Sequence, residues 1–321
     1  MRRHLPIVCA AGLDPVRFRR LAAWLTRDVA EGRFRPGFWG FHQTRARSAV
    51  ELIRMGTLDA ELAALVWLLV EARLPLIVAA RAPRVGKSTT LNALLDFLPP
   101  SVSRVELAGA AEDFQWLPEA ASLGWRSERA VVPPVPPRPD STYLIAAELS
   151  NHLPVYTWGD QARIAIRALS LGYGMGATIH AGSLEEVFGV LGAPPLRLSA
   201  DELSWLGVVL ILGLSPTGER RMTAAHYVRP VARDVHGHLQ RLGPAVLATW
   251  DPARDAFEHF GWGVITELAE RVERKAGDFE LEQRRRAEYL GGLADGGVTG
   301  VAEVQAALRG YSLEGAVQPG N

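Results

Sequence analysis

The chain has 321 residues, 48% of them hydrophobic, which is enough for a sizeable core in one large domain or two ordinary ones. Its 35 lysines and arginines balance 35 aspartates and glutamates, so no general basic field is available to hold nucleic acid. A single cysteine, Cys9, excludes an internal disulfide framework and suits a reducing cytosol.

The amino-terminal segment superficially resembles a signal peptide, but its apolar part is short, is broken by Pro6 and runs into Asp14 and several arginines. We interpret it as a first strand, followed by a helix over residues 15–31. No uninterrupted apolar run reaches the ~18–20 residues that a bilayer crossing needs. We therefore expect a soluble, cytoplasmic protein.

An apolar helix is predicted next, with Thr57 as its N-cap and the acids Asp59 and Glu61 in its first turn. A buried strand over residues 76–80 follows this helix. The strand leads into a sharp loop that ends in Gly86-Lys-Ser-Thr89 and then into a helix over residues 91–98.

Strand, loop and helix in this order are typical of a loop that binds nucleotide phosphates. Backbone N–H groups of the loop and of the helix N-terminus would point at phosphate oxygens. Lys87 would reach the β- and γ-phosphates, and the Ser88 hydroxyl would hold Mg²⁺. The phosphate-binding segment is therefore predicted to comprise five consecutive residues: Val85, Gly86, Lys87, Ser88 and Thr89.

The motif is incomplete, because the pattern G-x-x-x-x-G-K-[ST] requires glycine where this chain has Arg81. A Cβ at that position interferes if the loop needs a positive φ or a close approach of backbone to phosphate. The alternative interpretation is an ordinary Gly-Lys turn before a helix. Hydrolysis is a separate and weaker hypothesis than phosphate binding.

Strands and helices alternate after the loop, which predicts a mostly parallel α/β sheet with its ligand at the carboxyl ends of the strands. An antiparallel part with a hairpin turn at residues 251–255 and a helical region broken at Gly296-Gly297 follow, with a frayed tail after Tyr311. The expected strands cover residues 102–107, 143–147, 177–180, 206–214, 222–228, 244–250 and 256–260. The expected helices cover residues 161–171, 184–191 and 264–311.

The order of these motifs resembles that of the secretion-superfamily ATPases, the hexameric motors of type II secretion, type IV secretion and type IV pili or archaeal flagella. The resemblance runs from about Phe41 to Tyr311, and no single motif carries it. The matching stretches are residues 51–58 and 65–70 (lead-in helix), 92–100 (helix after the phosphate loop), 138–140 with 143–148 (Arg-Pro-Asp and Walker B strand), 168–173 with 178–183 (histidine box) and 250–252.

The resemblance implies a P-loop NTPase with a RecA-like core over residues 51–263, a reduced amino-terminal segment (1–50) and a carboxyl-terminal helical region (264–321). It implies a motor or assembly ATPase of a secretion or type IV pilus-like system, with ATP and Mg²⁺ as cofactors. A hexameric ring, a membrane platform protein as partner and no direct nucleic-acid contact are also implied. Such a protein is cytoplasmic or peripheral at the inner face of the membrane.

The resemblance also implies roles for four residues. Glu148 would orient the attacking water or act as general base, and the alternative is a solvated strand terminus. Glu112 falls where the family has an acidic box, and the equal alternative is a surface acid pair with Asp113. His180 would sense the γ-phosphate, or is a satisfied core histidine. Arg138 is the best candidate for an arginine finger from a neighbouring subunit.

Several positions depart from the family pattern, and all of them weaken the expectation of fast hydrolysis. The arginine of the Walker B motif is lost within residues 147–151, Tyr173 replaces a histidine, and Pro136 replaces the first arginine of the linker. The alternative function is therefore a degenerate, non-hydrolysing structural or regulatory subunit. A small-molecule kinase ranks third, because no lid or acceptor motif is evident. The carboxyl-terminal histidines (His226, His236, His238 and His259) are interpreted as surface residues rather than zinc ligands.

Overall fold

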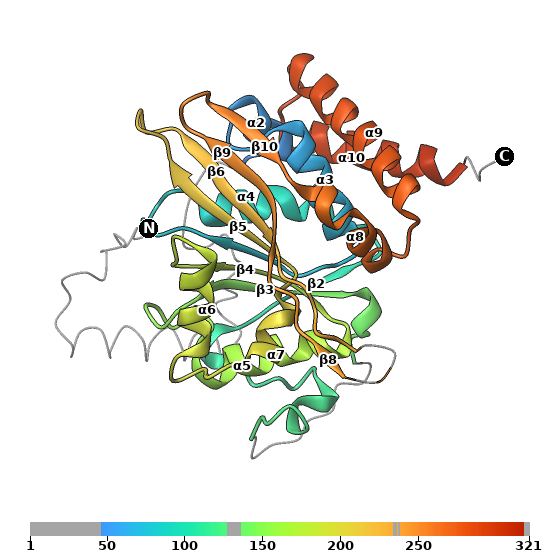
Figure 1. Cartoon of the computed structure of the whole chain (residues 1–321). Helices are drawn as coiled ribbons and strands as arrows, with labels where there is room; N and C mark the ends of the chain where they lie inside the picture. The colour runs from blue at the N-terminus through green and yellow to red at the C-terminus, as the bar shows by residue number, and fades with distance from the viewer. Residues whose placement is uncertain (1–45, 127–135, 234–235, 237, 318–321) are drawn as a thin grey trace, which may run out of the picture.

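The computed structural model describes residues 46–126, 136–233, 236 and 238–317. Within these ranges, eight strands form one sheet in the order β10-β9-β6-β5-β1-β4-β3-β2 (Figure 1). The strands from β5 to β2 are parallel to one another, and β6, β9 and β10 continue the sheet in antiparallel fashion. The predicted α/β fold, with its mostly parallel sheet and antiparallel appendage, is confirmed.

The strands lie close to their predicted positions. Their bounds are β1 (Leu76–Ala79), β2 (Ser103–Glu106), β3 (Thr142–Leu149), β4 (Gly174–Ile179), β5 (Val208–Leu214), β6 (Arg220–Tyr227), β9 (Ala245–Asp251) and β10 (Ala256–His259). The short strands β7 (Ala232–Arg233) and β8 (Leu239–Gln240) form a separate pair.

Strand β1 lies inside the parallel part of the sheet, paired with β4 on one side and β5 on the other. All of its residues are buried. Leu76 and Val78 belong to one apolar cluster, whereas Ile77 and Ala79 belong to a second one. Successive side chains of a strand point to opposite faces, so an uninterrupted apolar run is what a strand covered on both faces requires.

Helices cover both faces of the sheet (Figure 1). One layer contains α2 (Ala49–Arg54), α3 (Ala60–Glu71), α4 (Lys87–Leu95), α8 (Ile265–Arg271), α9 (Ala276–Asp295) and α10 (Val301–Val317). The opposite layer contains α5 (Gly159–Arg167), α6 (Leu184–Gly192) and α7 (Ala200–Leu203). The loop from β1 to α4 therefore lies at the carboxyl end of β1, between the two helical layers.

The carboxyl-terminal helices share the apolar core of α3. Arg286 of α9 is buried, and its guanidinium lies 4.5 Å from the centre of the Trp67 ring while pairing with Glu71. The predicted break at Gly296-Gly297 separates α9 from α10. Helix α10 continues to Val317, six residues beyond Tyr311, and the predicted fraying of the tail stays a prediction.

Helix α3 begins two residues later than predicted. Its N-cap is Asp59, whose side chain accepts a hydrogen bond from the Leu62 N–H at 2.9 Å. Thr57 is not the cap, because its carbonyl accepts a hydrogen bond of 2.7 Å from the Met222 N–H and so holds this segment against β6. Ser, Thr and Asp all cap helices well, and this tertiary contact decides between them.

Asp59 also accepts a hydrogen bond from His259 at the end of β10, with 2.8 Å between Nε2 and Oδ2. Burial lowers the pKa of His259, but the hydrogen bond to Asp59 and the charges of Asp59 and Glu61 outweigh it and raise the pKa above its ordinary value. The stabilisation is therefore fully present below the unfolded-state pKa of about 6.5 and is lost as the pH rises through the folded-state value.

We predict that His259→Gln loses part of this pH dependence. The difference in free energy of unfolding between wild type and variant should be larger at pH 5.5 than at pH 9, by on the order of 1 kcal/mol. Urea unfolding at both pH values measures it, with a substitution of the exposed His236, His236→Gln, as the control. Equal pH dependence of wild type and His259→Gln would contradict the assignment.

Among the described helices, none combines the length and apolar character that a membrane crossing requires. The strand and helix predicted within residues 1–45 lie outside the described residues. The proposed division at residues 50 and 263 stays a prediction.

Candidate functional site

Helix α4 starts without a side-chain cap, as do α5, α8 and α9, whereas α2, α3, α6 and α7 have one. Its N-cap is Gly86, in the left-handed region at φ 110° and ψ 20°. In α3 and α6, by contrast, the side chains of the N-cap residues Asp59 and Ser183 accept hydrogen bonds from backbone N–H groups of the first turn. The first turn of α4, which carries Ser88 and Thr89, thus has no side-chain acceptor at its N-cap, and its dipole favours an anion there.

Glycine at position 86 is required by φ and by a close contact. A Cβ built there would lie 3.1 Å from Nε of Arg220, the first residue of β6. The Arg220 Nε–H donates a hydrogen bond to the Val85 carbonyl. Arg220 therefore brings a cation against the loop, a role that the sequence did not indicate because this arginine is more than 130 residues away along the chain.

Arg81 occupies the position of the missing motif glycine without backbone strain. Its φ is not positive, whereas that of Arg84, three residues later, is 60°. The Arg81 side chain is 75% exposed, crosses Gly182 and pairs with Glu186 in the first turn of α6. The loop thus places its left-handed residues at positions 84 and 86, and a Cβ at position 81 is tolerated.

Removing the Arg81 side chain should have a small effect. We expect Arg81→Ala to change the free energy of unfolding by less than about 1 kcal/mol, because the ion pair with Glu186 is exposed. Nucleotide affinity should stay within about threefold of wild type, because an exposed ion pair on α6 holds the arginine. Thermal unfolding and binding of a labelled ATP analogue measure the two effects. A tenfold loss of affinity would mean instead that Arg81 contacts the phosphates.

Lys87, Glu148 and His180 lie together at the carboxyl ends of three strands. The Lys87 Nζ lies 3.6 Å from Glu148 Oε2, and 3.2 and 3.3 Å from Nδ1 and Nε2 of His180. His180 Nε2 lies 3.3 Å from Glu148 Oε1. Lys87 follows the loop after β1, Glu148 is near the end of β3 and His180 directly follows β4. The sheet order β1-β4-β3 accounts for this convergence.

Burial governs the charge state of this cluster. Lys87 and Glu148 are each 7% exposed, so the alternative of a solvated strand terminus is wrong for Glu148. Burial lowers the pKa of Lys87, and the charge of Glu148 opposes the shift. Burial also lowers the pKa of His180. The charges of Lys87 and His152 lower this pKa further, whereas the charge of Glu148 raises it. The result is a buried ammonium–carboxylate pair beside an imidazole that favours its neutral form.

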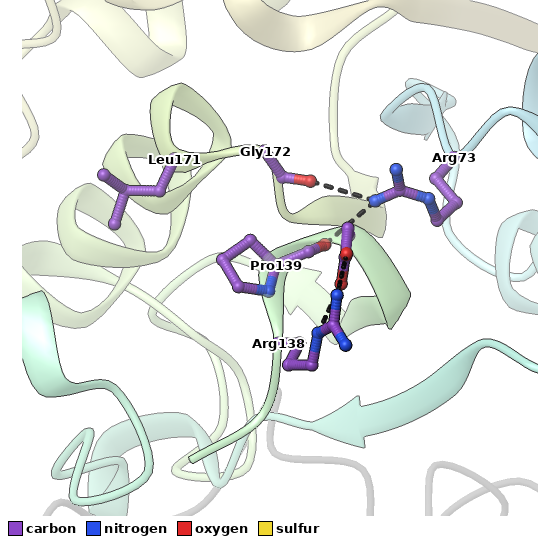
Figure 2. A pocket seen from close by; sticks show the side chains of 6 residues that line it. Arg73, Arg138, Pro139, Leu171 and Gly172 are labelled. Carbon is purple, nitrogen blue, oxygen red and sulfur yellow. Dashed lines mark hydrogen bonds and ion pairs between the residues drawn. The ribbon is translucent and has the colours of Figure 1, made fainter.

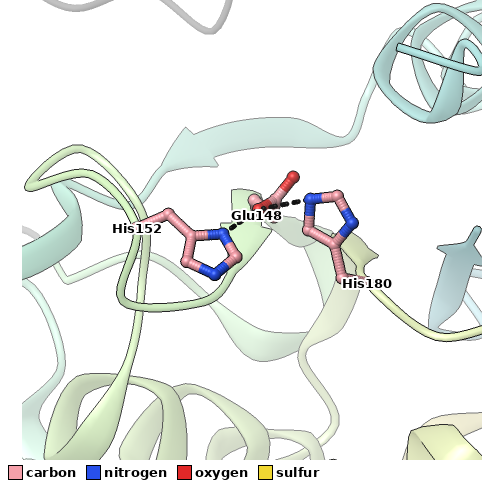
Figure 3. Close-up of side chains that lie close together, drawn as sticks. All are labelled: Glu148, His152 and His180. Carbon is pink, nitrogen blue, oxygen red and sulfur yellow. Dashed lines mark ion pairs between the residues drawn. The ribbon is translucent and has the colours of Figure 1, made fainter. Parts of the chain in front are cut away.

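The loop after β3 surrounds the carboxylate of Glu148. Ser150 Oγ donates a 2.9 Å hydrogen bond to Oε1, and His152 Nδ1 lies 3.8 Å from the same oxygen (Figure 3). Burial and the charge of Glu148 raise the pKa of Tyr156 to about 12. The sequence interpretation missed Ser150 and His152. Their signal was polar residues two and four positions after the acid that ends a buried strand.

Glu112 does not have the environment that the surface interpretation predicts. It is buried, so it does not form a surface acid pair with the exposed Asp113. Its carboxylate accepts hydrogen bonds from the backbone N–H groups of Ala108 and Phe114, both at 2.9 Å, and from the Trp116 indole at 3.1 Å. These contacts hold the loop after β2, and a catalytic role for Glu112 stays a prediction.

Arg138 lies at the opposite end of β3 from Glu148. The strand rises roughly 3.3 Å per residue, which puts about 20 Å between Thr142 and Glu148. There Arg138 pairs with Asp140 and, with Arg73, lines a pocket of about 400 Å³ (Figure 2). Arg138 is thus not brought to Lys87 of its own chain, and a finger role in a neighbouring subunit stays a prediction.

The residues present fit Mg²⁺ and a nucleotide phosphate in chemical type. Ser88 is half-buried in the first turn of α4, directly after Lys87, and offers a hydroxyl oxygen beside the helix N-terminus. Glu148 adds a carboxylate across from Lys87. Hydroxyl and carboxylate oxygens are the hard ligands that Mg²⁺ prefers.

No known family profile matches the sequence. Two uncharacterized proteins of Methanocaldococcus jannaschii are similar to the chain. The first is 26% identical over 260 residues, covering 76% of this chain and 90% of the relative. The second is 26% identical over 255 residues, covering 76% of this chain but only 45% of the relative.

Among solved structures, the chain matches in part a crystal structure of the VirB11 ATPase from the Brucella suis type IV secretion system in complex with sulphate. The match has a TM-score of 0.37 and 20% sequence identity over 62% of this chain and 61% of that chain.

Proposed function

We propose that this chain binds Mg·ATP and hydrolyses it as a motor or assembly ATPase of a secretion or type IV pilus-like system. The observation that carries the proposal is the convergence of Lys87, Glu148 and His180 beside the uncapped N-terminus of α4. A helix N-terminus, a buried lysine and a buried carboxylate together supply phosphate binding and water activation.

Each side chain has a distinct part in this proposal. First-turn N–H groups of α4 and Lys87 would bind the phosphates, and Ser88 would hold a magnesium ion, which would supply neutralisation of the phosphate charge. Glu148, kept in place by Ser150, accepts a hydrogen bond from the attacking water and orients it in line with the γ-phosphate. His180 lies between Lys87 and Glu148 and responds to the displacement of the lysine.

Phosphate binding requires Lys87 to leave its partner. The ammonium now lies 3.6 Å from Glu148, and a phosphate near the α4 N-terminus attracts it away from the carboxylate. Glu148 is then free to accept a hydrogen bond from water. One movement therefore couples occupancy of the phosphate site to activation of the base.

The motor role adds an oligomer and a partner to this chemistry. We propose a ring, hexameric as the resemblance implies, in which a neighbouring subunit supplies an arginine, with Arg138 as the best candidate. Domain motion in such a ring would act on a membrane platform protein. A monomer should then turn over slowly even with an intact phosphate loop.

The test is steady-state phosphate release by the purified full chain with Mg·ATP, with the oligomeric state recorded in the same buffer. Turnover that requires the assembled state supports the motor. ATP bound by a confirmed ring without any turnover would instead favour a non-hydrolysing structural or regulatory subunit. No binding of ATP by that ring would contradict the motor and would leave a structural subunit that binds no nucleotide.

A further inference from the structure

We propose that Glu148, His152 and His180 form a binding site for a divalent transition metal ion of the zinc type. Each residue offers one ligand atom, and the three atoms lie within 4.8 Å of one another. Two imidazoles and one carboxylate are a donor set that suits Zn²⁺ and neighbouring metals better than Mg²⁺, which prefers oxygen. Figure 3 shows both histidines flanking the carboxylate.

The spacing of the ligand atoms is close to what zinc requires. Ligands at about 2.1 Å in a tetrahedral arrangement lie about 3.4 Å apart. His180 Nε2 is already 3.3 Å from Glu148 Oε1, and His152 Nδ1 is 3.8 Å from the same oxygen. The His152 side chain is 62% exposed, so a small rotation is enough to complete the set.

The surroundings of the three residues also suit a metal site. Glu148 is buried, and Ser150 Oγ donates a hydrogen bond to it, which fixes the orientation of the carboxylate. Hydrogen bonds of this kind are what position carboxylate ligands in metal sites. The exposed His152 leaves a route by which an ion from solvent can enter.

Lys87 competes with the metal ion for Glu148 and His180. Its ammonium lies 3.2 to 3.3 Å from the ring nitrogens of His180 and 3.6 Å from Glu148. Two cations cannot share this carboxylate and imidazole without strong repulsion. The metal therefore binds when Lys87 moves away, and removing the lysine charge should strengthen binding.

Metal binding does not depend on the proposed ATPase activity. One consequence does rest on it: a metal ion that holds Oε1 of Glu148 takes the group assigned to water activation. Zinc is then expected to inhibit turnover. Failure of that inhibition would concern the ATPase hypothesis, whereas the binding measurement below decides the metal site alone.

The experiment is a zinc titration of the untagged, chelator-treated full chain in competition with a chromophoric chelator. We expect one ion per chain, with affinity at least about tenfold weaker in His152→Ala and in His180→Ala. Lys87→Met should bind zinc at least about tenfold more tightly than wild type. His236→Ala/His238→Ala, which changes the other close histidine pair of the described residues, is the matched control and should leave the affinity unchanged.

Misfolding would weaken zinc binding, whereas Lys87→Met is expected to strengthen it, so this variant separates the proposed effect from a folding defect. Circular dichroism checks that the variant is folded. Three outcomes would each overturn the site. These are no zinc binding by wild type, unchanged affinity in the His152 and His180 variants, and loss of binding in the His236/His238 control. Weaker zinc binding by a folded Lys87→Met would refute the competition and with it the proposed position of the ion.

Discussion

Glu148→Gln should lower ATP turnover by about a hundredfold or more, because a carboxamide cannot accept a proton from the attacking water. Glutamine has nearly the same shape and keeps an oxygen for the hydrogen bond from Ser150, so the variant should stay folded. Steady-state phosphate release measures the effect. The same variant should bind an ATP analogue at least as tightly as wild type, since Lys87 loses the anion that competes with phosphate.

The matched control is Glu112→Gln, which changes the other buried glutamate predicted to be catalytic. Glu112 accepts hydrogen bonds from its own loop and from Trp116. We expect this control to reduce thermal stability more than turnover. Normal turnover in Glu148→Gln would remove Glu148 from the mechanism. A rate loss confined to Glu112→Gln would assign the chemistry to the acidic box instead.

Lys87→Ala should weaken nucleotide binding by about tenfold to a hundredfold. A charged hydrogen bond to phosphate contributes about 1.5–3 kcal/mol, and every 1.4 kcal/mol is a factor of ten. Lys87 also provides the buried charge next to the α4 N-terminus, so both the electrostatic attraction and the hydrogen bond are lost. Equilibrium binding of a labelled ATP analogue, followed in parallel with thermal unfolding, measures the loss.

Arg81→Ala is the control for Lys87→Ala, because it removes a positive charge from the same loop without touching the buried cluster. Its affinity should remain near that of wild type. Unchanged affinity in a folded Lys87→Ala would refute the assignment of the phosphate loop, whatever the rest of the site does.

Local patterns predicted the sheet and its helices well. The apolar run of β1, the acid at the end of β3 and the hairpin at residues 251–255 each depend on neighbouring residues alone, and each lies where it was expected. Helix boundaries were less predictable. Thr57 and Asp59 are both good caps, and the contact between Thr57 and Met222 on β6 decides which one begins α3.

The candidate site was predictable only where the chain carries a recognisable spacing. Lys87, Glu148 and His180 follow three strands, and parallel topology alone brings such positions to one edge. Arg220 contributes through tertiary packing, which periodicity does not encode. His152 lies only four residues after Glu148, so its place in the site had a local signal that was missed. The sequence also could not show that the loop tolerates Arg81 in place of glycine. Only the loop conformation shows that its left-handed residues are Arg84 and Gly86.

The measurement that tests the central claim most directly is an experimental structure of the full chain with a non-hydrolysable ATP analogue and Mg²⁺. We predict the phosphates at the first-turn N–H groups of α4, with Lys87 Nζ bound to them and no longer 3.6 Å from Glu148. Ser88 Oγ should lie on the magnesium ion. An analogue bound elsewhere, with the contact between Lys87 and Glu148 intact, would contradict the account.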